Sequence, residues 1–400
     1  MQTTNTFNQY RLIMLDKLCR SQVPQPERTA MVEVIMILIL GILYGLILYN
    51  PHQVARELGI PAKQLYRRLH SLSARAWRWR RLLLLERMMT QAALQRLQEY
   101  QTRSPATRAR RQASLSIDDT VQKRLGKVLS YVWSWYSGQA QKTLAGQDLV
   151  GIVLCLNGEI LPVRLVWVSK QGQGRGPTGK PTLVLQIMKE LKEEFAQAGV
   201  DLTALGVSLD SWWISHTFSA QLEGLGFDKQ VICGKSHLIL ETEQSRQALG
   251  VHRKQIELKS GWGLGAQTSG ATAEGEQSEV GAGGSHFLPA AADKGLCAVV
   301  SGAGRALRTY EALRLWENYH GVEVFWKRLK SWLGLGRMQL RGREGTWAEL
   351  ALRGLAYPLA LALWGPHRRT LAQLRHWLHR QGTFIELVQE HFHPKGWGIA

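Results

Sequence analysis

Hydrophobic positions in the first hundred residues follow helical spacing. The uncharged run VIMILILGILYGLILY, residues 34–49, is nearly as long as the roughly 20 residues that a membrane-spanning helix needs. Glu33 directly precedes this run, and two glycines interrupt it. We therefore predict a buried core helix here, with a membrane segment or a pair of shorter elements as the alternatives.

A second helical pattern spans residues 50–72. Pro51 is typical of a helix start, Gly59 fits a turn, and Pro61 would begin a second helix. This is the layout of a helix-turn-helix, whose second helix lies in the major groove of DNA. Its exposed side chains would be Lys63, Gln64, Arg67 and Arg68. These residue types suit phosphates and base edges, and a plain helical hairpin is the alternative.

After a basic stretch at residues 102–111, expected to be a linker, the pattern changes to short apolar runs. Strands are expected at residues 114–118, 127–137, 149–157, 159–169, 205–210, 229–234 and 296–301. Helices are expected at residues 181–198, 217–225, 306–335 and 346–364, the last kinked near Pro358, and in the tail up to His391. Elements that alternate in this way predict an α/β fold behind an all-α N-terminal domain.

Composition separates one segment from the rest of the chain. Residues 261–286 are so rich in Gly, Ala, Ser and Thr that a packed core is not expected there, and we predict a mobile loop. The predicted domains are a helical domain at 1–112, an α/β domain in two parts at 113–239 and 296–365, an insertion at 240–295 and a helical tail at 366–400.

The net charge of the chain indicates which kinds of partner it binds. The 400 residues carry a net charge of +19, and residues 1–117 hold 18 Lys and Arg against 6 Asp and Glu. A field of this sign favours nucleic acid or an anionic membrane surface. The single cysteines, without a CxxC pair, indicate a reduced, cytosolic protein without a thiolate metal site. They are Cys19, Cys155, Cys233 and Cys297.

One glycine-rich stretch has a sequence similar to a nucleotide-binding motif. GRGPTGKP, residues 174–181, comes close to the phosphate-binding loop, but Pro181 stands where that motif needs a hydroxyl for magnesium. We therefore expect a flexible basic loop before a helix. A nucleic-acid backbone could pass over Lys170, Arg175 and Lys180.

Acidic residues stand out in this basic chain where apolar runs end. Asp118 and Asp119 follow SLSI, and Asp210 follows LGVSL and precedes two tryptophans. Taken singly, each acid is typical of a helix cap or turn. Glu323 lies on a predicted helix and shares its face with Lys330, two turns on, although a solvent-facing ion-pair helix explains that spacing equally well. Three converging carboxylates are what a pair of magnesium ions requires for phosphodiester cleavage.

The motifs LSIDDT, VSLDSWW and GVEVFWKRLKSWLGLGRMQLRGR resemble the three acidic motifs of the DDE transposases encoded by bacterial insertion sequences. The resemblance covers residues 114 to about 345 and implies the triad Asp118, Asp210 and Glu323, with Lys330 as the lysine of the third motif. It also implies a ribonuclease-H-like mixed sheet flanked by helices, with an insertion between the second and third acids.

The third motif departs from the family pattern. Where the motif has Tyr and Arg before the glutamate, this chain has Trp316 and Tyr319, and Arg314 is a neighbour that could substitute for the arginine. The insertion is also poor in strand-forming residues. These departures fit either a divergent subgroup or an inactive copy.

The resemblance further implies the activity and its partners. We expect an endonuclease and strand-transfer enzyme that binds the ends of a mobile element as a homodimer on double-stranded DNA, in the bacterial cytoplasm at the nucleoid and not at a membrane. Two Mg²⁺ ions, replaceable by Mn²⁺, would be held by the triad, with Asp119 as the alternative ligand to Asp118. Further DNA contacts are expected from Lys123, Trp212, Trp213, Lys235, Lys330, Arg337 and Arg341. The competing class is a non-catalytic DNA-binding protein, either a regulator or a domesticated relative.

Overall fold

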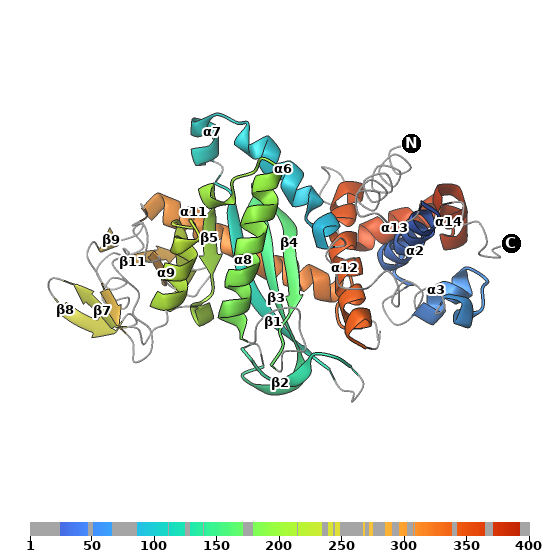
Figure 1. Cartoon of the computed structure of the whole chain (residues 1–400), viewed down its shortest axis with the longest axis horizontal. Coiled ribbons are helices and arrows are strands. Elements are labelled where there is room, and N and C mark those ends of the chain that lie inside the picture. The colour runs from blue at the N-terminus through green and yellow to red at the C-terminus, as the bar shows by residue number, and fades with distance from the viewer. Residues whose placement is uncertain are drawn as a thin grey trace.

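The structure is a computed structural model. It describes residues 25–46, 51–65, 86–110, 112–124, 129–138, 140–170, 179–213, 215–233, 309–337, 342–364 and 371–392. Between these ranges it also describes the short segments 239–242, 245–248, 267–268, 272–274, 285–289 and 296–301, and Leu307. Within these residues the chain has an α/β fold: a mixed β-sheet lies between helices, and further helices gather at one end of the molecule (Figure 1).

Six strands form the centre of the sheet in the order β4-β3-β1-β5-β6-β12. They are β1 (Ser114–Lys123), β3 (Lys142–Leu156), β4 (Glu159–Trp167), β5 (Gly206–Leu209), β6 (Gln230–Cys233) and β12 (Leu296–Ser301). Strands β1, β5 and β6 run parallel to one another, whereas β3 is antiparallel to β1 and β12 is antiparallel to β6. This mixed arrangement is compatible with the expected ribonuclease-H-like fold.

The first strand is longer than its apolar pattern indicates. β1 pairs with β3 from Ser114 to Lys123, whereas its parallel pairing with β5 ends at Ile117. The prediction that Asp118 and Asp119 close a strand is therefore wrong, because both lie within β1. Likewise, β3 begins at Lys142 rather than at residue 149. Both extensions carry polar residues, so the apolar pattern did not indicate them. Backbone pairing to a neighbouring strand does not require an apolar side chain.

Two helices cover the sheet from opposite sides. Helix α8 (Lys180–Gln197) lies across one face, and α11 (Thr309–Ser331) lies across the other (Figure 1). Helix α8 buries an apolar face that runs from Leu183 to Phe195. Helix α9 (His216–Gly224) lies beside α8. The predicted helices at 181–198 and 217–225 are thus confirmed within a residue at each end.

Helix α11 packs on the sheet so closely that glycines are needed beneath it. A Cβ atom at Gly206 of β5 would lie 2.1 Å from the side chain of Leu315. One at Gly151 of β3 would lie 2.6 Å from the ring of Trp326. Real Cβ atoms do not approach other atoms so closely, so these two glycines set the distance between α11 and the strands.

Helices from the two ends of the sequence pack together. They are α2 (Gln25–Tyr44), α12 (Gly342–Trp364), α13 (Leu371–Gln381) and α14 (Phe384–Phe392). The Tyr44 hydroxyl donates a hydrogen bond to the Gly382 carbonyl oxygen at 3.2 Å, and α12 continues as a helix through Pro358. Apolar residues from Val32 to Leu43 are buried, which confirms a core helix. No helix in the described ranges is long and apolar enough to cross a membrane.

The expected helix-turn-helix is described only in its first part. Helix α3 (Pro51–Glu57) begins at the predicted proline, and Gly59 adopts the predicted turn with φ +66°. Residues 62–65 are helical, with Lys63 exposed, but Arg67 and Arg68 lie outside the described residues. The motif therefore stays a prediction. Downstream, α6 (Gln91–Gln101) is followed by α7 (Pro105–Arg110) within the stretch that we expected to be a linker.

The insertion contains strands despite its composition. β7 (Ile239–Thr242), β8 (Ser245–Ala248) and β10 (Thr272–Glu274) form a three-stranded sheet. β9 (Gln267–Thr268) and β11 (Ser285–Pro289) extend the main sheet beyond β12, whereas β2 (Val132–Ser137) pairs with β3 at the opposite edge. The prediction of a mobile loop at 261–286 is thus wrong for the parts that form strands.

Candidate active site

The neighbouring carboxylates Asp118 and Asp119 lie on opposite faces of the sheet, because successive side chains of a strand alternate. Asp118 is paired with Gly151 of β3, and a Cβ atom on Gly151 would point at the ring of Trp326 in α11. Asp119 accepts a hydrogen bond from Lys180 of α8 at 2.6 Å. Asp118 is therefore the acid that faces α11. Asp119 does not serve as the alternative ligand, because its carboxylate is held by Lys180 on the other side of the sheet.

Asp210 follows the parallel neighbour of β1. Ser116 of β1 is in register with Ser208 of β5, and their hydroxyl oxygens lie 2.8 Å apart. The Ser116 hydroxyl also lies 3.2 Å from the Asn318 carbonyl oxygen of α11. Asp118 comes two residues after Ser116 within β1, so alternation places it on the α11 side, and Asp210 directly follows the last residue of β5.

The role of Asp210 as a helix cap is not supported. The N-cap of α9 is Ser215, whose hydroxyl oxygen accepts a hydrogen bond from the Phe218 backbone N–H at 3.4 Å. Asp210 instead precedes a short 3₁₀ turn, η4 (Ser211–Trp213), in which the Trp213 N–H bonds the Asp210 carbonyl oxygen at 3.0 Å. This turn fixes the backbone of Asp210 and leaves its carboxylate for another role.

Helix α11 brings Glu323 to the level of the two aspartates. Leu315 packs against Gly206. From Leu315 to Glu323 the helix rises about 12 Å, and from Gly206 to Asp210 the strand rises about 13 Å. The contact between Asn318 and Ser116 lies further along in the same direction. Glu323 therefore stands beside the end of the parallel pair, at the edge of the helix face that contacts the sheet.

Electrostatics agree with this placement. Burial raises the pKa of Asp118 well above its ordinary value, and the negative charges of Asp119 and Asp210, then of Glu323, raise it further, while a hydrogen bond from the Asp119 backbone N–H lowers it. Burial lowers the pKa of Lys330, and the charge of Asp118 opposes that effect. Asp118 is thus within electrostatic range of two further triad carboxylates and of the motif lysine.

The Glu323 carboxylate itself is turned outward. Its side chain is 60% exposed, and Oε2 lies 3.6 Å from Nδ1 of His320. Across the described ranges, no three His, Cys, Asp or Glu side chains are close enough together to hold a metal ion. The donor set nevertheless fits magnesium in kind, because carboxylate oxygens are its preferred protein ligands. A rotation of the exposed Glu323 side chain would be needed to complete such a site.

Aromatic side chains replace the motif Tyr and Arg beside Glu323. The rings of Trp316 and Tyr319 are buried and stacked, with centroids 5.1 Å apart and planes within 3°. Arg314 lies nine residues before Glu323, about two and a half turns away and so on the opposite side of the helix. It pairs with Glu317 at 2.9 Å. Arg314 therefore does not supply the missing guanidinium beside Glu323.

The two tryptophans after Asp210 differ in exposure. Trp213 is 2% exposed and packs on Phe218, with ring centroids 5.5 Å apart. Trp212 is 49% exposed. A base can therefore reach Trp212 but not Trp213, and the expected contact of Trp213 with DNA is wrong for this conformation. Lys123 and Arg337 are exposed, so their contact with DNA stays a prediction, whereas Lys235 and Arg341 lie outside the described residues.

Sequence reasoning missed a buried cluster on the α8 face of the sheet. Nζ of Lys180 lies 2.6 Å from an oxygen of Asp119 and 2.8 Å from an oxygen of Asp148. The Lys180 side chain is 10% exposed and that of Asp148 is fully buried. Lys180 is thus engaged by acids, which corrects the expectation that it contacts nucleic acid. The only sequence signal was Asp148 itself, a charge beside an apolar run.

The charged groups of this cluster shift one another's pKa values. Burial raises the pKa of Asp148 to about 7, and the neighbouring Asp119 adds to that rise while Lys180 opposes it. Burial lowers the pKa of Lys180, but Asp148 and Asp119 together bring it above its ordinary value. Lys180 therefore stays protonated and carries the positive charge of the cluster.

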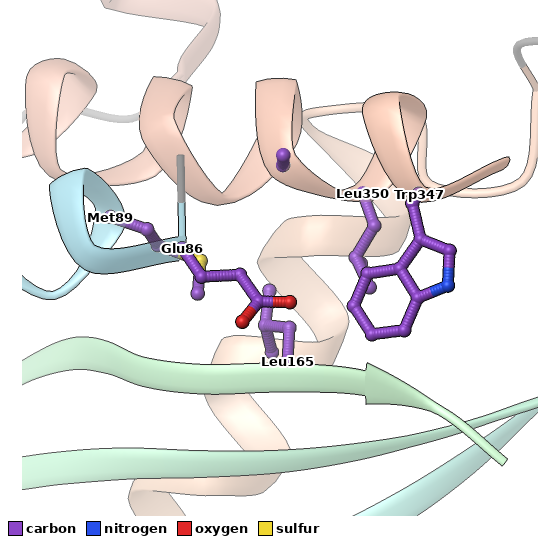
Figure 2. A pocket seen from close by; sticks show the side chains of 6 residues that line it. Glu86, Met89, Leu165, Trp347 and Leu350 are labelled. Carbon is purple, nitrogen blue, oxygen red and sulfur yellow. The ribbon is translucent and has the colours of Figure 1, made fainter. Parts of the chain in front are cut away.

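A small cavity elsewhere does not serve as a substrate site. It lies between β4, α12 and residues 86–89 and holds about 10 Å³, room for about one water molecule. Figure 2 shows Glu86 extending above Leu165 of β4 and toward α12. The cavity is lined by Glu86, Met89, Leu165, Trp347, Leu350 and Ala351.

Comparison with known proteins adds no assignment to this geometry. No family model matches the chain, and no curated protein matches it either.

Proposed function

We propose that this chain is a DDE transposase of the kind encoded by bacterial insertion sequences, built on a ribonuclease-H-like catalytic domain. One observation supports the proposal: Asp118 lies in β1, Asp210 follows the paired strand β5, and Glu323 lies on α11, which packs on these strands near enough for its charge to act on Asp118. These acids are far apart in the sequence, so their approach is a property of the fold rather than of local composition.

The triad would hold two Mg²⁺ ions, or Mn²⁺ in their place. When bound, such ions activate the attacking oxygen and stabilise the departing one in phosphodiester cleavage and strand transfer. Burial, and then the negative charges of Asp119 and Asp210, raise the pKa of Asp118, and a bound cation would favour its ionised form. Lys330, half-buried near Asp118, would contact a phosphate of the DNA strand being cut.

The remaining surface would bind DNA. The net charge of +19 favours a polyanion, and the helix-turn-helix expected at residues 51–72 would read the element ends. Exposed Trp212, two residues after Asp210, would stack on a base turned out of the duplex near the cut. Two copies of the chain would act together, because two ends must be cut and joined.

Metal-dependent nicking tests this proposal. The substrate is DNA that carries the gene with the sequence on either side of it, incubated with Mg²⁺ or Mn²⁺. Wild-type protein is expected to nick this DNA, and Asp210→Asn is expected to abolish nicking while DNA binding persists. Glu223→Gln, an exposed acid on α9, is the matched control and should cleave as wild type does.

The same experiment distinguishes the catalytic proposal from the competing class. If wild-type protein and Asp210→Asn both bind the flanking DNA and show the same absence of nicking, the chain is a non-catalytic DNA-binding protein. The catalytic proposal would then be abandoned.

A further inference from the structure

Five elements meet at the ammonium group of Lys180. Its Nζ contacts Asp119 of β1 and Asp148 of β3. The same atom lies 4.8 Å from the ring centre of Trp212 in η4 and 5.8 Å from that of Trp135 in β2. Lys180 itself begins α8, directly after Gly179, whose φ of +98° sets the entry of the chain into the helix.

Stability alone does not account for this cluster. Two carboxylates and one ammonium group must be removed from water, and buried ion pairs of this kind often contribute less than apolar residues of similar volume. Asp148 is fully buried. What such a cluster does provide is a defined geometry, because a displaced partner would leave a buried charge uncompensated.

The two ends of the cluster are connected to the candidate metal ligands. Asp119 directly follows Asp118 in β1, so the position of one backbone fixes the other. Trp212 comes two residues after Asp210, inside the turn closed by the Trp213 N–H and the Asp210 carbonyl oxygen. Lys180 therefore links the strand that carries Asp118 to the turn that carries Asp210, from the opposite face of the sheet.

We propose that Lys180 is a positioning residue, which holds the Asp118 strand and the Asp210 turn at the separation that a shared metal ion requires. This inference rests on the proposed function. A cation over an indole ring stabilises one placement of that ring, and more strongly when the cation is largely removed from water. Magnesium demands near-ideal octahedral geometry, so a small shift of the turn would weaken its binding.

The effect is measurable as Mn²⁺ affinity in the absence of DNA. Electron paramagnetic resonance of free Mn²⁺ gives the dissociation constant, and the site-specific part is the binding that Asp210→Asn removes. The key variant is the double change Lys180→Met with Asp148→Asn, which leaves the net charge of the cluster unchanged. Asp148→Asn alone is the matched control, because it retains Lys180 between Asp119 and Trp212.

The expected result is a dissociation constant about 10- to 100-fold higher in the double variant than in Asp148→Asn, which is the usual effect of removing an outer-shell partner of a metal site. Equal constants in the two variants, both folded by circular dichroism, would overturn the positioning role. A merely structural role would lower the fraction of protein that binds Mn²⁺ and leave the dissociation constant unchanged, which also overturns the inference.

Trp212→Leu provides an independent route if the double variant does not fold. Trp212 is half exposed, so the change leaves the core intact but removes the ring beneath Lys180. A higher Mn²⁺ dissociation constant than that of wild type supports the inference, and an unchanged one overturns it. Wild-type protein without site-specific Mn²⁺ binding would instead overturn the proposed function, and the positioning role with it.

Discussion

The side chain of Asp148 has the most unusual surroundings of the described acids on the α8 face. It is fully buried, and its pKa of about 7 results from burial and the nearby Asp119. The sequence could not indicate this, because a charge beside an apolar run is equally typical of a strand end. By contrast, Asp118, Asp210 and Glu323 could be selected from sequence, because each stands in a distinctive motif. That Asp119 points away from Asp118 followed only from the length of β1.

Removal of Asp148 should change how stability depends on pH. The folded-state pKa of about 7 exceeds the unfolded value of about 3.9, so the folded state binds the proton more tightly. The contribution of this group to stability is therefore complete below about pH 4 and is lost as pH rises to about 7. In urea unfolding between pH 4 and 8, Asp148→Asn should lack this decline. If the free energy of unfolding depends on pH in the same way for wild type and Asp148→Asn, the raised pKa of Asp148 is contradicted.

The two tryptophans after Asp210 should respond oppositely to truncation. Trp213→Ala removes a buried ring and should lower the free energy of unfolding by about 3–5 kcal/mol. Trp212→Ala removes a half-exposed ring and should cost much less stability, while it weakens binding to single-stranded or melted DNA. Urea unfolding and fluorescence anisotropy with labelled DNA measure the two effects. Equal losses of stability would show that both rings are core.

Among the elements, the sequence predicted several short strands as closely as the helices, but it missed the extensions of two strands. Helices α8 and α9 lie within a residue of their predicted bounds, because their apolar faces repeat with helical spacing. β1 and β3 extend past their apolar runs, because their extra residues pair with a neighbouring strand. The close packing of α11 on the sheet depends on contacts at Gly206 and Gly151. The local sequence pattern does not predict these contacts.

Gly206→Ala should disturb the site through α11. The new Cβ would lie 2.1 Å from the Leu315 side chain, so α11 or the Leu315 rotamer must shift, at a cost of about 1–3 kcal/mol. The shift should also weaken Mn²⁺ binding, since Glu323 lies on the same helix. Gly224→Ala in α9 is the matched control, because nothing lies within 4 Å of its Cβ position, and it should be neutral or slightly stabilising. Similar effects of both changes would refute the close contact.

For the whole molecule, the sequence pattern could not predict which distant helices pack together. The burial of residues 34–43 was predicted correctly, but not that α2 packs on α12, α13 and α14 from the other end of the chain. Apolar periodicity identifies a buried face without naming its partner. The predicted order of elements favoured an α/β fold, and the resemblance of the acidic motifs implied a mixed sheet flanked by helices; the sheet has that form.

The proposed function requires that three carboxylates from three elements jointly hold divalent cations. A crystal structure of the full chain with flanking DNA and Mn²⁺ tests it most directly, because Mn²⁺ is located by its anomalous scattering. We expect two peaks about 3.5–4 Å apart, in contact with Asp118, Asp210 and a Glu323 side chain turned away from His320. Peaks elsewhere, or a Glu323 carboxylate still beside His320 with Mn²⁺ and DNA bound, would contradict it.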